Sequence, residues 1–262
     1  MHHFIVELKI KHFNKTMEIL KKTKSLGELV IKRIEKNFAK ELIVKNHYSK
    51  SWNQGGFGVY NFGIFRKEDM ENCLGVAVYG YMKNPKARIF EHPSQQAWMI
   101  ELNRMWIHDS LGKNSETILI SSSLKLLKKL DRNIVAVQSF ADGRLGCGTI
   151  YKASNFKYYG FHTTKFARNK RTGAILHNQN FTNTTCTSSY LRNNIGYLIG
   201  DFEVFQVKTY RYIYALSRHF VFTLKKEQPY PKYEKGLQNI KWERNHTILK
   251  DHIVKMVYSL KQ

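Results

Sequence analysis

Asp142 is the leading candidate for a chemical role in this chain, because of its residue type and its position in the sequence. It follows the apolar run Ile134–Val137 and comes just before a glycine-rich turn at 146–148. A carboxylate there can accept or orient a proton, and open α/β sheets bind ligands beyond the carboxyl ends of their strands. Aspartate also commonly opens a turn by accepting backbone N–H bonds. Position alone therefore leaves both interpretations open.

A second charged strand lies upstream. The strand-like run 98–107 contains Glu101-Leu102-Asn103-Arg104 and leads through a polar loop into a helix predicted at 117–130. The loop carries Gly112 and Lys113, and a helix N-terminus offers free N–H groups that bind phosphate. An ordinary helix capped by Asn114 or Ser115 fits the same loop. Neither a Walker pattern nor a complete G-x-G-x-x-G is present.

Hydrophobic spacing predicts the elements that must position these residues. Helices are expected at about 16–45, 117–130, 148–156 and 246–260. Strands are expected at 58–66, 73–82, 98–107, 134–140, 159–166, 173–177 and 202–214, the first two as a hairpin around the polar turn 67–72. This order predicts an α/β (α+β) fold, with a central mixed sheet flanked by helices, extra C-terminal strands and a terminal helix.

The charge of the chain indicates a polyanionic partner. Lysine and arginine number 43 against 20 acidic residues, a formal charge of +23 in 262 residues. An AT-rich genome would explain abundant lysine but not the shortage of acidic residues. Aromatic residues make up 13% of the chain, and several stand beside cations, as in Tyr210-Arg211-Tyr212. Such pairs suit an unstacked base and its phosphates, although most aromatic side chains are expected in the core.

Length and composition predict one domain, 1–262, with a core at about 16–225 and a C-terminal appendage at about 229–262 that begins at Pro229-Tyr230-Pro231. No apolar run is long enough to span a bilayer and no signal peptide is recognised, so a cytoplasmic protein is expected. Three separated cysteines without C-x-x-C spacing predict neither a disulfide framework nor a zinc site. No histidine spacing supports a metal site, so none is predicted.

Four segments together resemble a known family. They are Glu101-Leu102-Asn103-Arg104, the loop 112–116, Ser139-Phe140-Ala141-Asp142, and the run 148–156, with His47-Tyr48-Ser49-Lys50 as a shorter match upstream. The resemblance is to the phage Mom family of DNA-adenine modification proteins. It implies a GNAT-type acyltransferase fold, whose element order agrees with that predicted above. It also implies acylation of the N6 amine of adenine in DNA, of the acetamido or methylcarbamoyl type, which protects phage DNA from host restriction endonucleases.

Two departures accompany this resemblance. Cys147 stands in the glycine turn where the family tends to carry a histidine. The Gln/Arg-x-x-Gly-x-Gly/Ala loop by which GNAT enzymes bind acyl-CoA is absent, as it is in the family itself. The cofactor is therefore less determined than the fold.

The motifs and the resemblance assign roles to particular residues. Asp142 is expected to accept or orient the N6 proton, and the resemblance implies that Tyr151 protonates a departing thiolate. Arg104 would hold a DNA phosphate or balance Asp142. The other expected site residues are His47 and Tyr48 beside the catalytic groups, Lys113, Asn114, Ser115 and Ser121 for the cofactor, and Ser49, Ser139, Ser154 and Asn155 for the substrate.

Acetyl-CoA or a related acyl-CoA is the implied cofactor, and double-stranded DNA with a flipped adenine is the implied partner, inside an infected bacterial host. An acyltransferase acting on RNA, a small amine or a protein, and a non-enzymatic nucleic-acid-binding protein, remain as alternatives. The sequence leaves open the acyl group and its direct donor, any need for iron, the DNA sequence context and the oligomeric state.

Overall fold

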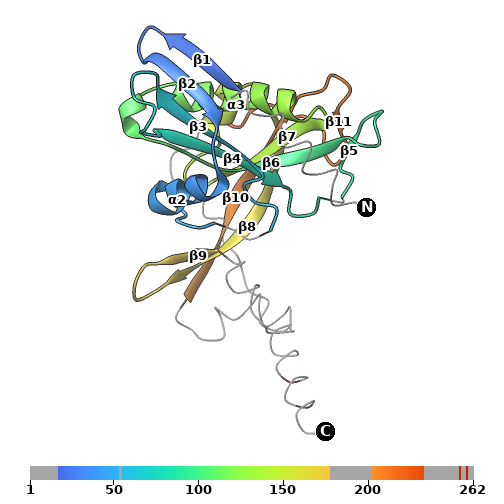
Figure 1. Ribbon diagram of the computed structural model, residues 1–262. Helices are drawn as coiled ribbons and strands as arrows, with labels where there is room; N and C mark the ends of the chain where they lie inside the picture. The colour runs from blue at the N-terminus through green and yellow to red at the C-terminus, as the bar shows by residue number, and fades with distance from the viewer. Residues whose placement is uncertain are drawn as a thin grey trace, which may run out of the picture. The chain divides into compact units, whose positions relative to one another are not determined.

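A computed structural model describes residues 17–52, 55–85, 87–177 and 202–232, together with Val254 and Tyr258. The described residues form two compact units (Figure 1). The larger unit takes its residues from 17–141, 147–160 and 210–232, and the smaller from 142–146, 161–177 and 202–209. The strands β7, β8 and β10 pass from one unit into the other. The prediction of a single domain stays a prediction.

The larger unit is built on a mixed sheet. Its strands are β1 (Glu18–Thr23), β2 (Gly27–Arg33), β3 (Tyr60–Arg66), β4 (Gly75–Tyr81), β6 (Trp98–Ile107), β7 (Ile134–Asp142) and the adjoining parts of β10 (Phe202–Ala215) and β8 (Lys157–Asn169), paired in the order β1-β2-β3-β4-β6-β7-β10-β8. Pairs from β1 to β6 are antiparallel, and β6 and β7 are parallel. A short pair, β5 (Phe90–Glu91) and β11 (Val221–Phe222), stands apart from this sheet.

Two helices cover opposite faces of the sheet. Alternate side chains of β4 point to opposite faces. Val76 and Val78 pack with Ala39 and Ile43 of α2 (Lys36–Asn46). On the other face, α3 (Ser115–Leu130) packs its buried leucines into the main core with Ala77 and Tyr79 of β4. The remaining helices are the 3-10 turn η1 (Asp109–Leu111) and the short α4 (Thr149–Ala153).

A β-bulge interrupts β6 at Asn103. Arg104 is opposite Val78 and Leu102 is opposite Tyr79, so Asn103 is an extra residue without a partner on β4. Residues three apart in a regular strand point to opposite faces, but a bulge shifts this alternation. Glu101 is opposite Gly80, two residues from Val78, and the bulge therefore turns Glu101 and Arg104 to the same face.

The strands β6 and β7 pair only over their first halves. Their register runs from Trp98–Ile134 to Glu101–Gln138, and no further register pair joins them among the described residues. Beyond this point β6 stays bound to β4 as far as Ile107. The end of this pairing is where a ligand is expected to bind, beyond the carboxyl ends of parallel strands.

The smaller unit contains the outer parts of β8 and β10 and the strand β9 (Ile175–His177), which pairs antiparallel with β8. Phe166, Phe205 and Val207 form its buried cluster. Two guanidinium groups lie over these rings, Arg144 at 4.0 Å from the centroid of Phe166 and Arg168 at 5.1 Å from that of Phe205.

The predicted strands and the central helix are confirmed: 58–66 and 73–82 form the hairpin β3–β4, and 98–107, 117–130 and 134–140 correspond to β6, α3 and β7. The prediction of a helix over 16–45 is wrong for most of its length. Residues 18–33 form the hairpin β1–β2, and only 36–46 are helical. Thr23 bonds to Leu26 N and Gly27 O, and Gly27 has φ 71°, so a tight turn breaks the apparent helical period.

The predicted helix over 148–156 is shorter, at Thr149–Ala153, because Asn155 takes a left-handed conformation with φ 61° and ends it. The predicted terminal helix and appendage lie almost wholly outside the described residues. Within the described ranges, no helix has both the length and the apolar character that crossing a bilayer requires.

Candidate active site

Arg104 links β6 to the turn that follows α2. Its Nε donates to Ser49 Oγ at 3.2 Å, and Ser49 Oγ lies 2.8 Å from His47 Nδ1. The Arg104 guanidinium also donates to the Asn103 carbonyl at 2.7 Å and lies 5.4 Å from the centroid of the Phe57 ring. Three residues predicted from two separate motifs, His47 and Ser49 from one and Arg104 from the other, are thus brought into one hydrogen-bonded group.

His47 is held as a neutral imidazole. Burial, and then the positive charge of Arg104, lower the pKa of His47 to about 4. The Ser49 backbone N–H donates to Nδ1 at 3.1 Å, so the neutral ring carries its proton on Nε2. The neighbouring Tyr48 ring lies 4.2 Å from the His47 ring and is 59% exposed. An exposed aromatic beside a neutral imidazole and a cation can face a flat, polar ligand.

Tyr151 approaches the same region from α4. Ser139 Oγ lies 2.9 Å from the Tyr151 hydroxyl and 3.2 Å from the Leu102 carbonyl oxygen, so it connects α4 to both strands. Burial raises the pKa of Tyr151 to about 12, and the group is within electrostatic range of Tyr48, Glu101 and Arg104. Tyr151 is therefore protonated at neutral pH and can act as a hydrogen-bond donor or a general acid.

Asp142 lies in the smaller unit, and its carboxylate is hydrogen-bonded to Arg144. Arg144 donates to it from the backbone N–H at 2.9 Å and from Nε at 3.0 and 2.9 Å, and the Nη2 group completes an ion pair. This fork holds both carboxylate oxygens. The partner of Asp142 is thus a cation two residues away along the chain.

A groove runs between α3 and the end of α4. Thr117, Ile118, Ser121 and Leu124 line it from α3, with Ala153, Ser154, Asn155 and Tyr214 opposite, around a volume of about 250 Å³. The Ser154 hydroxyl is buried without a hydrogen-bond partner in the described structure. The groove unites Ser121, predicted for the cofactor, with Ser154 and Asn155, predicted for the substrate.

The loop before α3 meets its predicted role only in part. Asn114 takes a left-handed conformation at the N-cap and makes no side-chain cap bond. Ser115 is fully buried, and its hydroxyl donates to the Gly112 carbonyl at 2.7 Å. Lys113 is exposed. Lys113 and the backbone N–H groups in the first turn of α3 are therefore the groups in this loop that a phosphate could reach.

Within the larger unit, these contacts bring the neutral imidazole of His47 and the guanidinium of Arg104 into one hydrogen-bonded group, and the protonated phenol of Tyr151 lies within electrostatic range of Arg104. Residues 28–232 match the model of the Mom protein family. The chain belongs to the Mom protein family.

One Mom-family relative is the methylcarbamoylase mom of Escherichia phage Mu, which is 37% identical over 142 residues. The match covers 53% of this chain and 56% of that protein, so it spans about half of each. Solved structures that resemble this Mom chain include NAA60 of Arabidopsis thaliana in complex with acetyl-CoA, with a TM-score of 0.44, 9% identity and coverage of 72% of this chain and 99% of that one. The ribosomal-protein-S5-alanine acetyltransferase of Vibrio fischeri has a TM-score of 0.40, 8% identity and coverage of 77% and 98%.

Sequence reasoning missed the residues beside Arg104 in this Mom chain. Gln138 Nε2 donates to Glu101 Oε2 at 2.9 Å across the last register pair of β6 and β7. Asn103, on the bulge, also bonds to the Glu101 carboxylate. The one signal in the sequence was a carboxylate inside a strand-like run. Its partner on β7 depends on strand register, which the sequence does not display.

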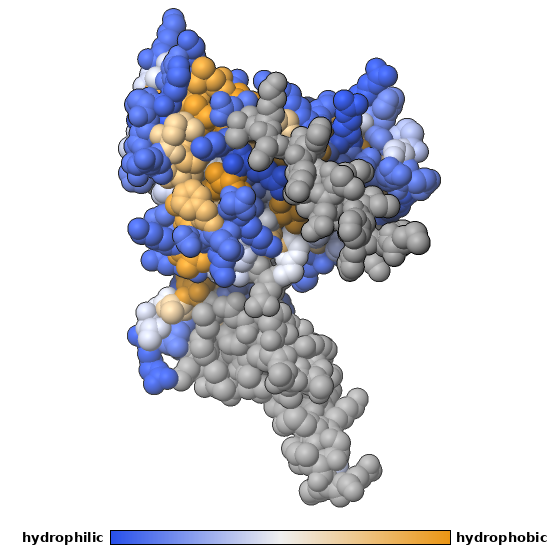
Figure 2. All heavy atoms as spheres, viewed as in Figure 1, coloured by the Kyte–Doolittle hydropathy of each residue, from blue (hydrophilic) through white to orange (hydrophobic). Residues whose placement is uncertain are grey.

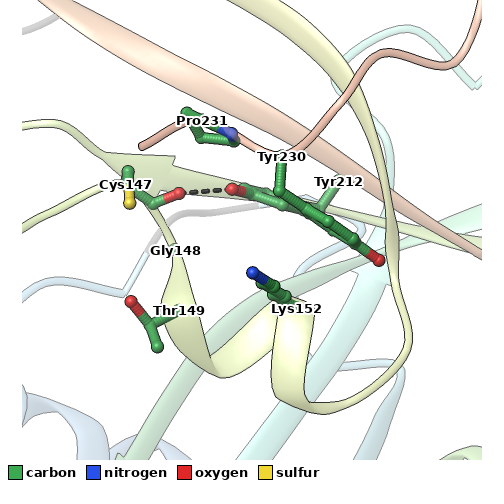
Figure 3. Close-up of a pocket in the computed structure, with 7 residues that line it drawn as sticks. All are labelled: Cys147, Gly148, Thr149, Lys152, Tyr212, Tyr230 and Pro231. Carbon is green, nitrogen blue, oxygen red and sulfur yellow. Dashed lines mark hydrogen bonds between the residues drawn. The ribbon is translucent and has the colours of Figure 1, made fainter. Parts of the chain in front are cut away.

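A second pocket lies at the glycine turn where this Mom chain carries Cys147. It has a volume of about 130 Å³ and is lined by Cys147, Gly148, Thr149, Lys152, Tyr212, Tyr230 and Pro231 (Figure 3). The Tyr212 hydroxyl donates to the Cys147 carbonyl oxygen, and Lys152 Nζ lies 5.2 Å from the centroid of the Tyr230 ring. Cys147 is 6% exposed, so its thiol packs against this wall.

No three histidine, cysteine, aspartate or glutamate side chains in the part of the chain that the structure describes are grouped closely enough to hold a metal ion.

Proposed function

We propose that this chain is a DNA-modification enzyme that acylates the N6 amine of adenine, in the acetamido or methylcarbamoyl manner, and so protects phage DNA from restriction endonucleases. Membership of the Mom family and the phage relative named methylcarbamoylase support this proposal. The observation that carries it is the convergence of Arg104, Tyr151 and Glu101, from β6 and α4, where β6 and β7 separate.

DNA is the proposed substrate because the chain is strongly basic. The formal charge is +23, and hydrophilic residues cover much of the described surface in the view of Figure 2. The target base must leave the duplex before an acyl donor can reach it, which costs a few kcal/mol. Exposed Tyr48, beside Arg104 and His47, provides a ring on which an extruded adenine can stack. The reaction would take place in the cytoplasm of an infected bacterium.

The chemistry requires a proton acceptor and a proton donor. Adenine N6 is a weak nucleophile because its lone pair is delocalised into the ring, so a base must take a proton as the nitrogen attacks. Asp142, from the sequence, and Glu101, from the structure, are the two candidate carboxylates. Tyr151 is the candidate donor to a departing thiolate, because its raised pKa keeps it protonated. Arg104 would stabilise the oxyanion or hold a DNA phosphate.

Acyl-CoA is the proposed donor, and the groove between α3 and α4, at about 250 Å³, would receive part of it. Its buried Ser154 hydroxyl lacks a partner, and Ser121 and Asn155 line the same walls. Lys113 and the N-terminus of α3 would attract the phosphates of such a donor, which supplies an activated acyl group as a thioester. Ser121 is therefore proposed for the donor, and Ser154 and Asn155, which the sequence predicted for the substrate, line the same groove. Ser49 and Ser139, also predicted for the substrate, contact Arg104 and Tyr151.

Two other functions make different predictions. An acyltransferase for RNA, a small amine or a protein would keep Tyr151 and the groove but leave DNA adenine unmodified. A basic nucleic-acid-binding protein would need neither Tyr151 nor a carboxylate at the site.

Mass spectrometry of nucleosides separates these functions. DNA is taken from cells that express the wild type, Asp142→Ala or Tyr151→Phe. A modified adenine in the wild type that falls sharply in Tyr151→Phe supports the proposed enzyme. Its absence from wild-type DNA, with the protein folded and bound to DNA, would overturn it.

A further inference from the structure

Glu101 is a partly buried carboxylate with no salt-bridge partner among the described residues. Two amide side chains, Gln138 and Asn103, donate to it, and the nearest charges are Arg104 on β6 and Arg211 on β10. Tyr151 on α4 is within electrostatic range. None of these cations is within 4 Å of the carboxylate. Burial outweighs all of these groups and raises the pKa of Glu101 above its ordinary value.

Gln138 has a buried hydrogen-bond acceptor without a partner in the described structure, beside the Glu101 carboxylate. The side chain is 4% exposed, and its Nε2 group is used by Glu101. Its Oε1 atom is buried and has no hydrogen-bond partner in the described structure. A buried amide oxygen without a partner costs roughly 1–3 kcal/mol, so such groups usually have a partner in the working complex.

The Oδ1 atom of Asn103 is also buried without a partner. Asn103 lies on the bulge that turns Glu101 and Arg104 to one face. Neutral and anionic acceptors thus collect at the end of the β6–β7 pairing, and their common need is a ligand with N–H donors. A primary amine on an aromatic ring offers two N–H groups from one nitrogen.

We propose that Glu101 and Gln138 together receive the exocyclic amine of the substrate, with one N–H donated to the Glu101 carboxylate and the other to Gln138 Oε1. This inference rests on the proposed function, for which it names the atoms that select the substrate. Glu101 is the catalytic residue of the pair, and Gln138 is a positioning residue.

The proton balance of the reaction then closes. The N6 nitrogen forms a bond to the acyl carbon, and its proton moves to the Glu101 carboxylate. The C–S bond of the thioester breaks, and the sulfur receives the proton of the Tyr151 hydroxyl. Asp142 is less suited to the first step, because the Arg144 fork engages both of its oxygens.

The test compares DNA duplexes that differ by one amine. In each duplex a single target base stands opposite an abasic site, which lowers the cost of extruding it. The target is adenine in one duplex and purine, which lacks the N6 amine, in the other. The wild type should bind the adenine duplex about tenfold or more tightly, the value expected for a hydrogen bond to a charged group.

Variants assign this preference to the pair. Gln138→Leu and Glu101→Gln should each reduce the adenine-to-purine affinity ratio severalfold, with little change in affinity for the purine duplex. Glu91→Gln, which changes an exposed carboxylate on β5, is the matched control and should keep the wild-type ratio. Thermal unfolding of Gln138→Leu checks its fold. If Gln138→Leu is unstable, the isosteric Glu101→Gln still tests the proposal.

The pH dependence of the adenine-to-purine affinity ratio distinguishes a proton-accepting role of Glu101 from a purely structural one, because a structural role would not change this dependence. The wild-type ratio should rise with pH as the Glu101 carboxyl ionises, with a midpoint above the ordinary carboxyl range because the folded pKa is raised. Glu101→Gln should remove this rise. In cells, Glu101→Gln should lower modified adenine by about 10²–10⁴-fold, and Asp142→Asn by less.

The outcomes separate this inference from the function on which it rests. A wild type that modifies adenine yet binds both duplexes equally, or whose ratio survives in both variants, overturns the inference alone. A wild type that prefers the adenine duplex while leaving cellular DNA unmodified overturns the proposed function and supports the amine-binding pair.

Discussion

Arg104 Nε donates to Ser49 Oγ at 3.2 Å, and this bond joins the bulged strand β6 to the turn after α2. Through Ser49 the guanidinium reaches His47 Nδ1. One side chain therefore couples the charge of the sheet to the protonation of an imidazole that lies 57 positions earlier in the sequence.

Removal of the Arg104 charge should raise the pKa of His47. In the wild type, burial and the Arg104 charge hold this pKa at about 4, so the ring is neutral above that pH. Arg104→Gln removes the second cause and leaves the first, so the pKa should move towards 6.5 without reaching it. NMR titration of the ring protons measures this value, and an unchanged pKa in Arg104→Gln would contradict the proposed coupling.

Loss of the Tyr151 hydroxyl should lower activity and spare the fold. Tyr151→Phe keeps the ring in the core with Phe156 and Tyr212 and removes only the bond to Ser139. General acid–base groups typically contribute about 10²–10⁴-fold, and modified adenine should fall within that range. Nucleoside mass spectrometry measures the loss, and circular dichroism checks the fold. Tyr158→Phe, on β8, is a control for the loss of a buried phenol elsewhere in the same core.

DNA affinity should fall steeply with salt. Each phosphate that a lysine or arginine neutralises releases counterions, which gives a log–log slope of roughly −0.9 per contact. With a formal charge of +23, we expect several such contacts. Fluorescence anisotropy of a labelled duplex over a range of salt concentrations measures the slope. Affinity that does not change with salt would remove DNA as the partner.

Gly148→Ala should destabilise the larger unit. Gly148 has φ 89°, and a Cβ added there would meet the Tyr212 ring at 2.6 Å and Ala141 Cβ at 2.9 Å. Left-handed backbone costs a non-glycine residue roughly 1–2 kcal/mol, and overpacking adds about 1–3 kcal/mol.

Gly27→Ala is the matched control, because Gly27 has φ 71° but no heavy atom within 4 Å of the added Cβ. It should show the backbone cost alone. The difference between the two free energies of unfolding, measured by urea denaturation, then isolates the contacts with Tyr212 and Ala141. Equal losses in the two variants would contradict those contacts.

Several features of this protein are determined by sequence itself. The apolar runs of β6 and β7 and the leucine spacing of α3 locate these elements because each burial pattern lies within one continuous segment. The spacing of apolar residues around 16–33 predicted a helix wrongly, because Ile19, Leu29 and Ile31 also suit a β-hairpin. The turn at Gly27 decides between helix and hairpin. Motif resemblance identified His47, Arg104 and Tyr151 before any contact between them was known.

Tertiary structure alone decided which of these residues meet. The Glu101–Gln138 pair exists because β6 and β7 are parallel in one particular register, and a shift by one residue would turn either side chain to the other face. The bulge at Asn103 depends on how β6 pairs with β4, and it places Glu101 beside Arg104 against the regular alternation. These relationships join residues that lie on different strands, so they follow from strand pairing and cannot be found in any single segment of the chain.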